Sequence, residues 1–134
     1  MIIIRTSEET IGKVVRHSKH SLKMCPRQLS KDDIILIAQT KHSLHFAKEP
    51  IQYLMEFDSC YYDKERESLQ LFGRYWPYII KGRNCRPLKT PFDISKVKTA
   101  SKNYGQGGPI VYVEHEDEAL LKDRGLLETL KNLP

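Results

Sequence analysis

Short apolar segments separated by polar turns dominate the first half of the chain. Three β-branched residues at positions 2–4 predict an opening strand. Residues 7–16 then show helical spacing of apolar positions, with Thr6 as candidate N-cap and a glutamate three residues later. Residues 34–40 form a continuous apolar run of strand length. The pattern therefore predicts strand, helix and strand, with residues 17–30 as mostly loop between helix and second strand.

Two further strands are predicted around the middle of the chain. Residues 51–62 begin with regular apolar and polar alternation, which is typical of a half-buried strand with Ile51 and Met55 on one face. A charged turn over 63–67 follows. Residues 75–82 then predict a strand that places Trp76, Tyr78 and Ile80 on one face.

The end of the chain returns to helix. A Gly-rich loop over 100–109 precedes a short strand over 110–113 and a helix over 115–133 that is interrupted at Gly125. Strands dominate without regular alternation of strand and helix, which excludes a parallel Rossmann-type sheet. We expect one α+β domain over residues 1–134, built as a partly closed mixed β-barrel with peripheral helices.

The composition is that of an ordinary globular protein. Hydrophobic residues make up 40% and charged residues 29% of the 134, which excludes disorder, collagen-like repeats and a disulfide scaffold. No apolar run reaches the roughly 20 residues of a membrane span, and the first residues hold no signal-peptide core, so we expect a cytoplasmic protein. The three widely spaced cysteines, Cys25, Cys60 and Cys85, predict reduced thiols, two of them buried.

Positive charge is concentrated in two segments. The net charge is +5, with +5 over residues 1–31 and +7 over 71–106 against −4 over 32–70 and −3 over 107–134. If the two basic segments meet in the fold, they form one positive face that attracts nucleic acid. Two separate solvated loops are the alternative. The candidate phosphate contacts are Lys23, Arg27, Arg74, Lys81, Arg83, Arg86 and Lys102.

Other chemistry has weaker support in the sequence. Histidines three residues apart occur at 17 and 20 and at 42 and 45, but no Cys or acid stands at matching ligand spacing. No local signature of a nucleophile surrounds any cysteine. Residues 102–108 lack the spacing of a P-loop. We therefore expect no metal, no cofactor and no catalytic residue.

Aromatic and basic residues alternate in one segment. Residues 74–78 read Arg-Tyr-Trp-Pro-Tyr and hold the only tryptophan, and Lys81, Arg83 and Arg86 follow. Stacking of bases on aromatic rings, with phosphates on Lys and Arg, is how single strands are bound. The alternative is that Trp76 belongs to the core.

Several short motifs resemble the PUA-like superfamily, and most closely its EVE-type branch, which is related to YTH domains. Residues 31–33 with the apolar run after them are similar to the K-x-G-D turn and strand of that family, with Asp32 in place of Gly. Residues 76–81 with 86–88 resemble its aromatic-Pro-aromatic strand and Pro-Leu segment, and residues 107–118 resemble its ending. Together these motifs cover most of the chain.

The resemblance implies a small β-barrel that binds nucleic acid and accepts a flipped, modified base between aromatic walls. The family takes one wall from the segment that is 14–24 here, which holds no aromatic residue. Either a histidine and the Tyr/Trp cluster form the pocket, or the ligand differs. The candidate pocket residues are Ser18, Lys19, His20, Trp76, Tyr78 and Tyr104.

The sequence thus favours a non-enzymatic nucleic-acid-binding module, with recognition of a modified base in DNA or RNA as the finer hypothesis. Two alternatives stay open. The same cavity could serve a small-ligand binder or enzyme, because a fold does not fix a function. The chain could also be a protein-interaction subunit of a larger assembly.

Overall fold

The computed structural model describes residues 1–27, 29–40, 50–93, 97 and 110–130. Within these residues the chain forms six strands and three helices. In chain order the elements are β1 (Ile2–Ser7), α1 (Glu8–His17), β2 (Lys19–Leu22), β3 (Ile34–Thr40), β4 (Pro50–Tyr62), α2 (Glu67–Phe72), β5 (Tyr78–Asp93), β6 (Ile110–Tyr112) and α4 (His115–Asp123).

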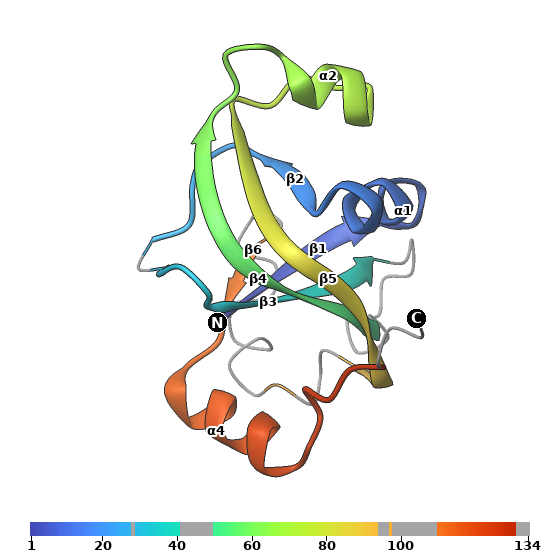
Figure 1. Cartoon of the computed structure of the whole chain (residues 1–134), viewed down its shortest axis with the longest axis vertical. Helices are drawn as coiled ribbons and strands as arrows, with labels where there is room; N and C mark the ends of the chain where they lie inside the picture. The colour runs from blue at the N-terminus through green and yellow to red at the C-terminus, as the bar shows by residue number, and fades with distance from the viewer. Residues whose placement is uncertain (28, 41–49, 94–96, 98–109, 131–134) are drawn as a thin grey trace.

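All six strands belong to one mixed sheet in the order β2-β5-β4-β3-β1-β6. β1 runs parallel to β3, and the other pairs are antiparallel. β4 and β5 form a long curved hairpin with α2 at its tip, and α4 lies at the opposite end of the molecule (Figure 1). The edge strands β2 and β6 do not pair within the described residues, so the sheet stays open along one seam. The expected α+β architecture, a mixed sheet that is not closed and has peripheral helices, is confirmed.

The apolar runs are explained by burial on both faces of the sheet. Ile3 and Leu36 pack on one face with Leu121 of α4. Ile4 packs on the other face of the sheet with Val14 of α1. A strand covered on both faces reads as a continuous apolar run rather than an alternation. β1 and β3 are therefore the strands that the sequence identifies most directly.

The long hairpin departs from regular alternation. The register between β4 and β5 shifts at three places, and such a shift changes the face that the following side chains occupy on one of the two strands. The prediction that Ile51 and Met55 share a face is wrong, because they belong to opposite core clusters. Gly82 allows β5 to approach β4 closely, since a Cβ there would lie 2.5 Å from the Met55 Sδ.

Two elements are absent from the sequence-based prediction. The segment predicted as loop, 17–30, contains β2, whose four residues are ordered by pairing with β5. α2 follows directly on the predicted charged turn. β2 depends on its pairing with the distant strand β5, and α2 has only six residues, so neither shows a period of its own in the sequence.

Two predicted boundaries are wrong. β5 begins at Tyr78 rather than 75 and continues to Asp93, so Trp76 precedes the strand and shares no strand face with Tyr78. α4 ends at Asp123, just before Gly125, whose φ of +68° is readily adopted by glycine. None of the helices in the described residues is long and apolar enough to cross a membrane.

A disulfide joins Cys25 to Cys60, with the two Cα atoms 6.0 Å apart. The prediction of three reduced thiols is therefore wrong, and only Cys85 remains a free thiol. The two partners are 35 residues apart in the chain. Pairing of β2 with β5, and of β5 with β4, brings the segment after β2 beside β4, which the spacing of the cysteines alone does not reveal.

Candidate functional site

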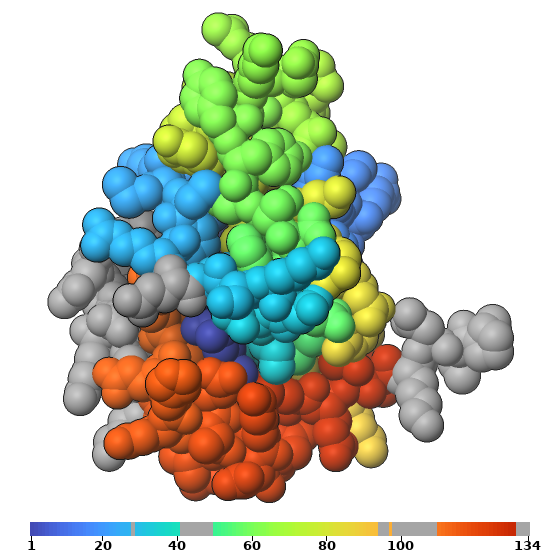
Figure 2. Space-filling model, turned by 60° about the vertical axis from the view of Figure 1, so that its left-hand side comes forward, coloured from blue at the N-terminus to red at the C-terminus, as the bar shows by residue number. Residues whose placement is uncertain are grey.

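The open seam between β2 and β6 holds a cavity of about 640 Å³. We name this cavity the seam cleft. Leu22 of β2 and Tyr112 of β6 form opposite sides, and the segment after β2 contributes Lys23 and Arg27. Figure 2 shows that segment, in light blue, at the surface between α2 and α4. The complete lining is Arg5, Leu22, Lys23, Met24, Cys25, Arg27, Thr40, Trp76, Ile110 and Tyr112.

Trp76 lies at the wall of the seam cleft with two cations against its ring. The Lys23 Nζ is 5.2 Å and the Arg74 Cζ 5.0 Å from the ring centroid. Both side chains are exposed, whereas the indole is half-buried. Such cation–π contacts hold positive charge next to an aromatic face.

A buried carboxylate fixes the backbone of Trp76. The Trp76 N–H donates to the Ser68 hydroxyl over 3.1 Å, and that hydroxyl donates to Asp63 over 2.6 Å. Asp63 is only 2% exposed and also accepts from the backbone N–H groups of Glu67 and Ser68. Burial by itself raises the pKa of Asp63, but these hydrogen bonds outweigh it and lower the pKa below its ordinary value.

A smaller cavity of about 140 Å³ adjoins the seam cleft and shares Arg5 and Trp76 with it. We name it the inner pocket. Hydroxyl-bearing residues from β1, α1 and β2 line it together with two aromatic rings and a histidine. Its lining is Arg5, Thr6, Ser7, Thr10, His20, Ser21, Phe72, Arg74 and Trp76.

His20 is a neutral wall of the inner pocket. Its ring stacks on Phe72 at a centroid distance of 5.9 Å. Burial lowers its pKa, although a hydrogen bond to the Ser21 carbonyl opposes the shift. The Nδ1 lies 2.6 Å from that carbonyl oxygen, so Nδ1 carries the proton and donates it there. The imidazole is therefore uncharged at neutral pH.

Both cavities are positively charged in character. None of the described residues that line them is acidic. The basic residues in the two linings are Arg5, Lys23, Arg27 and Arg74. A concave site lined by charges of one sign focuses the field and concentrates ligands of the opposite sign. The arrangement is suited to an anion that also offers a flat surface for stacking.

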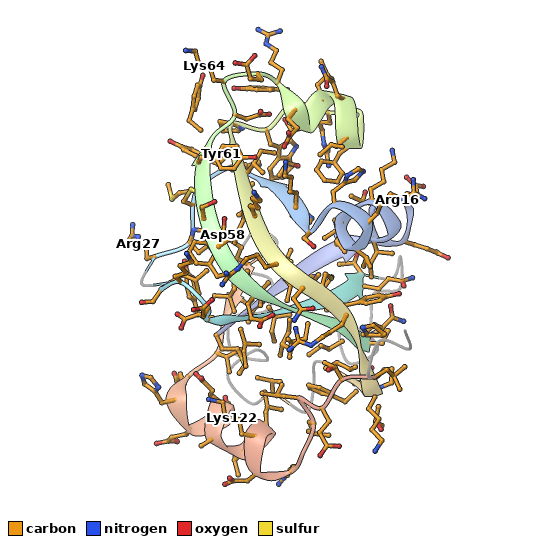
Figure 3. The ribbon with its side chains drawn as sticks, in the orientation of Figure 1. Arg16, Arg27, Asp58, Tyr61, Lys64 and Lys122 are labelled. Atoms are coloured by element: carbon orange, nitrogen blue, oxygen red, sulfur yellow. A yellow bond between two sulfur atoms is a disulfide. The ribbon has the colours of Figure 1, made fainter. Side chains whose placement is uncertain are left out.

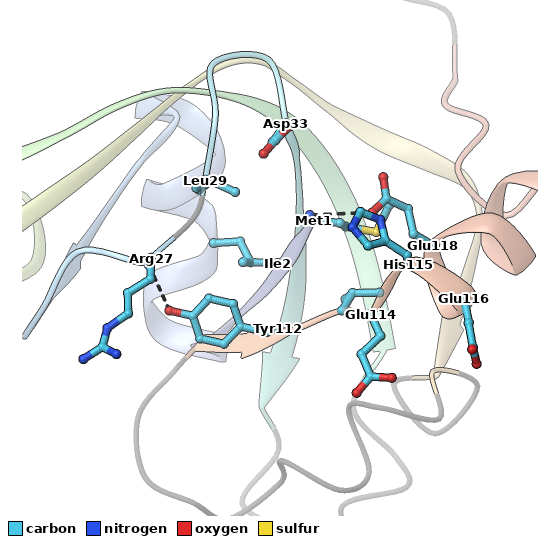
Figure 4. A pocket seen from close by; sticks show the side chains of 11 residues that line it. Met1, Ile2, Arg27, Leu29, Asp33, Tyr112, Glu114, His115, Glu116 and Glu118 are labelled. Atoms are coloured by element: carbon cyan, nitrogen blue, oxygen red, sulfur yellow. Dashed lines mark hydrogen bonds and ion pairs between the residues drawn. The ribbon is translucent and has the colours of Figure 1, made fainter.

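A third cavity, again of about 640 Å³, has the opposite character (Figure 4). Its lining includes Asp33, Glu114, Glu116 and Glu118. Tyr112 and Arg27 line both this acidic cavity and the seam cleft. The Arg27 backbone N–H donates to the Tyr112 hydroxyl over 3.1 Å. These carboxylates would repel an anion that reached past Tyr112.

The structure brings together two of the candidate pocket residues, Trp76 and His20. Ser18 ends α1, and its carbonyl accepts from the Gly82 N–H. The Lys19 ammonium instead binds Glu67 over 2.9 Å, and this hydrogen bond raises the Lys19 pKa. Tyr78 packs edge-on against Tyr62. Tyr104 lies outside the described residues.

The candidate phosphate contacts divide into two groups. Lys23, Arg27 and Arg74 lie at the seam cleft or the inner pocket, and Arg27 projects outward from its loop (Figure 3). The others on β5 lie elsewhere. Arg83 forms ion pairs with Asp32 and Asp58, Arg86 forms one with Glu56 over 2.7 Å, and Lys81 is exposed opposite Lys19. Lys102 lies outside the described residues.

Sequence reasoning missed Arg5, Thr6 and Tyr112 as lining residues of these cavities. A signal for the first two was present, because polar residues directly follow the opening apolar run on the same strand. Tyr112 gave no signal, since its role depends on β6 forming the second edge of the seam.

No protein-family model matches the chain, and no curated protein matches it by sequence. Solved structures do match the fold. The ASCH protein from Zymomonas mobilis superposes with a TM-score of 0.61 at 12% identity, over 91% of this chain and 93% of that one. A single-residue variant of it gives a TM-score of 0.62 at 11% identity, over 91% and 96% of the two chains. At these identities the likeness shows the fold alone, and that fold is PUA-like.

Proposed function

We propose that the protein is a non-enzymatic module that binds single-stranded nucleic acid, RNA in particular, in the seam cleft. The observation that carries this proposal is the position of Trp76, with Lys23 and Arg74 against its ring, beside a cleft without acidic lining among the described residues. Single strands are bound by stacking of bases on aromatic rings and by cations along the backbone. The PUA-like fold supports RNA as the ligand.

In this proposal each part of the cleft has a distinct task. A base stacks on Trp76 by displacing the Lys23 ammonium from the ring, and Lys23 and Arg27 then contact the adjacent phosphates. The cleft volume of about 640 Å³ is within the range of roughly 300–1,000 Å³ found for ligand sites, so a whole nucleotide can enter. The acidic cavity beyond Tyr112 keeps the backbone on one side.

Recognition of a modified base is the finer form of the proposal. A base that leaves its neighbours to stack on Trp76 also presents its edges to the lining of the cleft and can be read there. We expect tighter binding to an oligonucleotide in which one base is methylated than to the identical unmodified strand. Equal affinity would leave general single-strand binding in place and remove the base-reading role.

The first prediction concerns the cations of the cleft. The double variant Lys23→Gln, Arg27→Gln should bind an RNA oligonucleotide about 10- to 100-fold more weakly at low salt, because two phosphate contacts are lost. The slope of log affinity against log salt should become shallower by about 1.4, since each contact to a single strand contributes about 0.7. Fluorescence anisotropy across a salt series measures both quantities.

The matched control is the double variant Arg83→Gln, Arg86→Gln. It removes the same charge, but these guanidinium groups already pair with acidic side chains on the sheet. We expect little change in the salt slope. If the control weakens binding as much as the cleft variant does, the phosphates follow β5 instead of the seam.

The second prediction concerns Trp76. Trp76→Leu should weaken oligonucleotide binding by about 1–3 kcal/mol, the usual contribution of one stacked base. Because Trp76 is the only tryptophan, a stacked base should also quench the intrinsic fluorescence of the parent protein directly. A large drop in melting temperature with unchanged affinity would instead assign Trp76 to the core.

A further inference from the structure

We propose that the inner pocket binds a single phosphate group, carried by the nucleotide whose base stacks on Trp76. The inference rests on the proposed function, because the inner pocket and the seam cleft share Trp76 and Arg5 as walls. It adds a specific anion site to what is otherwise a general basic cleft.

The first support is an unsatisfied hydroxyl. Thr6 is 3% exposed, and its Oγ1 has no hydrogen-bond partner in the part of the chain that the structure describes. Alternation along β1 puts Thr6 on the same face as Ile2 and Ile4, the face that α1 covers. A buried hydroxyl without a partner destabilises a fold. A phosphate oxygen in the inner pocket would supply the missing acceptor.

The second support is the start of α1, which contributes Ser7 and Thr10 to the pocket lining. Ser7 is the N-cap, but its hydroxyl pairs with that of Thr10 over 2.8 Å and makes no cap bond to the backbone. The first N–H groups of this ten-residue helix thus lack the usual side-chain acceptor. Helix N-termini bind phosphate through these groups and the helix dipole. The acids of the first turn, Glu8 and Glu9, are exposed and do not line the pocket.

Charge and size both favour one phosphate. Arg5 and Arg74 are the charged residues among the described lining, and arginine matches phosphate oxygens in geometry. The volume of about 140 Å³ corresponds to about four or five water molecules at roughly 30 Å³ each. A phosphate group has five non-hydrogen atoms, whereas a nucleotide is several times larger. The base must therefore remain in the seam cleft.

The first experiment uses inorganic phosphate and two variants of Thr6. Thr6→Val removes the hydroxyl and keeps the shape, and Thr6→Ser keeps the hydroxyl. Without phosphate, Thr6→Val should melt at the same or a higher temperature than the parent, because an unpaired buried hydroxyl is gone. Added phosphate should raise the melting temperature of the parent and of Thr6→Ser but not of Thr6→Val. Potassium chloride at equal ionic strength is the control.

The second experiment separates the two sources of phosphate. Oligonucleotides of one sequence, with and without a 5′-phosphate, are titrated into the parent and both variants. If the inner pocket binds a terminal phosphate, the parent should bind the phosphorylated strand about tenfold more tightly than the other strand. This difference should be lost in Thr6→Val and kept in Thr6→Ser. If the inner pocket binds a backbone phosphate, Thr6→Val should bind both strands more weakly than the parent, by the same factor.

The inference is overturned if Thr6→Val responds to phosphate and binds both strands as the parent does. Failure of the proposed function gives a different result. In that case the parent itself binds neither strand with salt dependence, whether or not inorganic phosphate raises its melting temperature.

Discussion

Replacing Asp63 by asparagine is expected to lower the free energy of unfolding by about 2–4 kcal/mol, because a buried hydrogen-bonded charge is lost. The Asp63 carboxylate accepts three hydrogen bonds, from two backbone N–H groups of α2 and from the Ser68 hydroxyl. An asparagine amide would direct its own N–H groups toward these donors. Urea denaturation followed by circular dichroism measures the loss. The exposed neighbour Glu65 offers the control Glu65→Gln, which should change stability little.

The same carboxylate sets an acid limit to stability. Its pKa in the folded protein lies below the ordinary value, so its contribution is complete above about pH 4 and is lost as the pH falls through the folded pKa. The parent should therefore lose stability below about pH 4, and Asp63→Asn should lose less over that range. Trp76 emission should shift as well, because Ser68 links Asp63 to the Trp76 backbone. If the parent and Asp63→Asn lost the same amount of stability below about pH 4, this assignment would be contradicted.

Reduction of the Cys25–Cys60 disulfide should lower the free energy of unfolding by about 3–4 kcal/mol, the chain-entropy value for a loop of this size. The disulfide closes a loop with a sequence separation of 35 and fixes the segment that carries Lys23 and Arg27 against β4. Releasing that segment should also weaken oligonucleotide binding. Denaturation and anisotropy titrations with and without a thiol reductant measure the two effects, and Cys60→Ser should reproduce both.

Cys85 provides the control for the disulfide. Burial raises the pKa of its thiol to about 11, with Arg86 opposing the shift, so the thiol is protonated and unreactive at neutral pH. Cys85→Ser should leave binding unchanged and remain sensitive to reductant like the parent. Equal stability of oxidised and reduced parent protein would show that the disulfide does not restrain the fold.

The strands with two buried faces were predictable because their apolar runs need no partner to be recognised. β3 matches the predicted residues 34–40, and β1 begins where the isoleucines begin. β2 and α2 were not predictable in the same way. β2 exists through its pairing with β5, and α2 begins where Asp63 accepts its first N–H groups. β2 thus depends on a strand that the local sequence does not specify, whereas α2 has a local partner in Asp63 but is too short, at six residues, to show a helical period.

The candidate site shows the same limit. A sequence displays charges but not what each charge binds. Lys23 and Arg83 look alike in the chain, yet one lies against Trp76 and the other pairs with Asp32. Trp76 stood out because aromatic and basic residues alternate around it. Thr6 did not, because only packing reveals that its hydroxyl is buried with no partner among the described residues.

The open seam also bears on self-association. β2 and β6 are the sheet edges, and an unpaired edge is a template for a strand from a second molecule. Both edges are short, at four and three residues, and Lys23 directly follows one of them. Short edges and flanking lysines are common defences against edge-to-edge aggregation. Lys23, to which the proposed function assigns a phosphate contact, would thus also discourage edge pairing with a second copy of the chain, and variants that remove it would aggregate more readily.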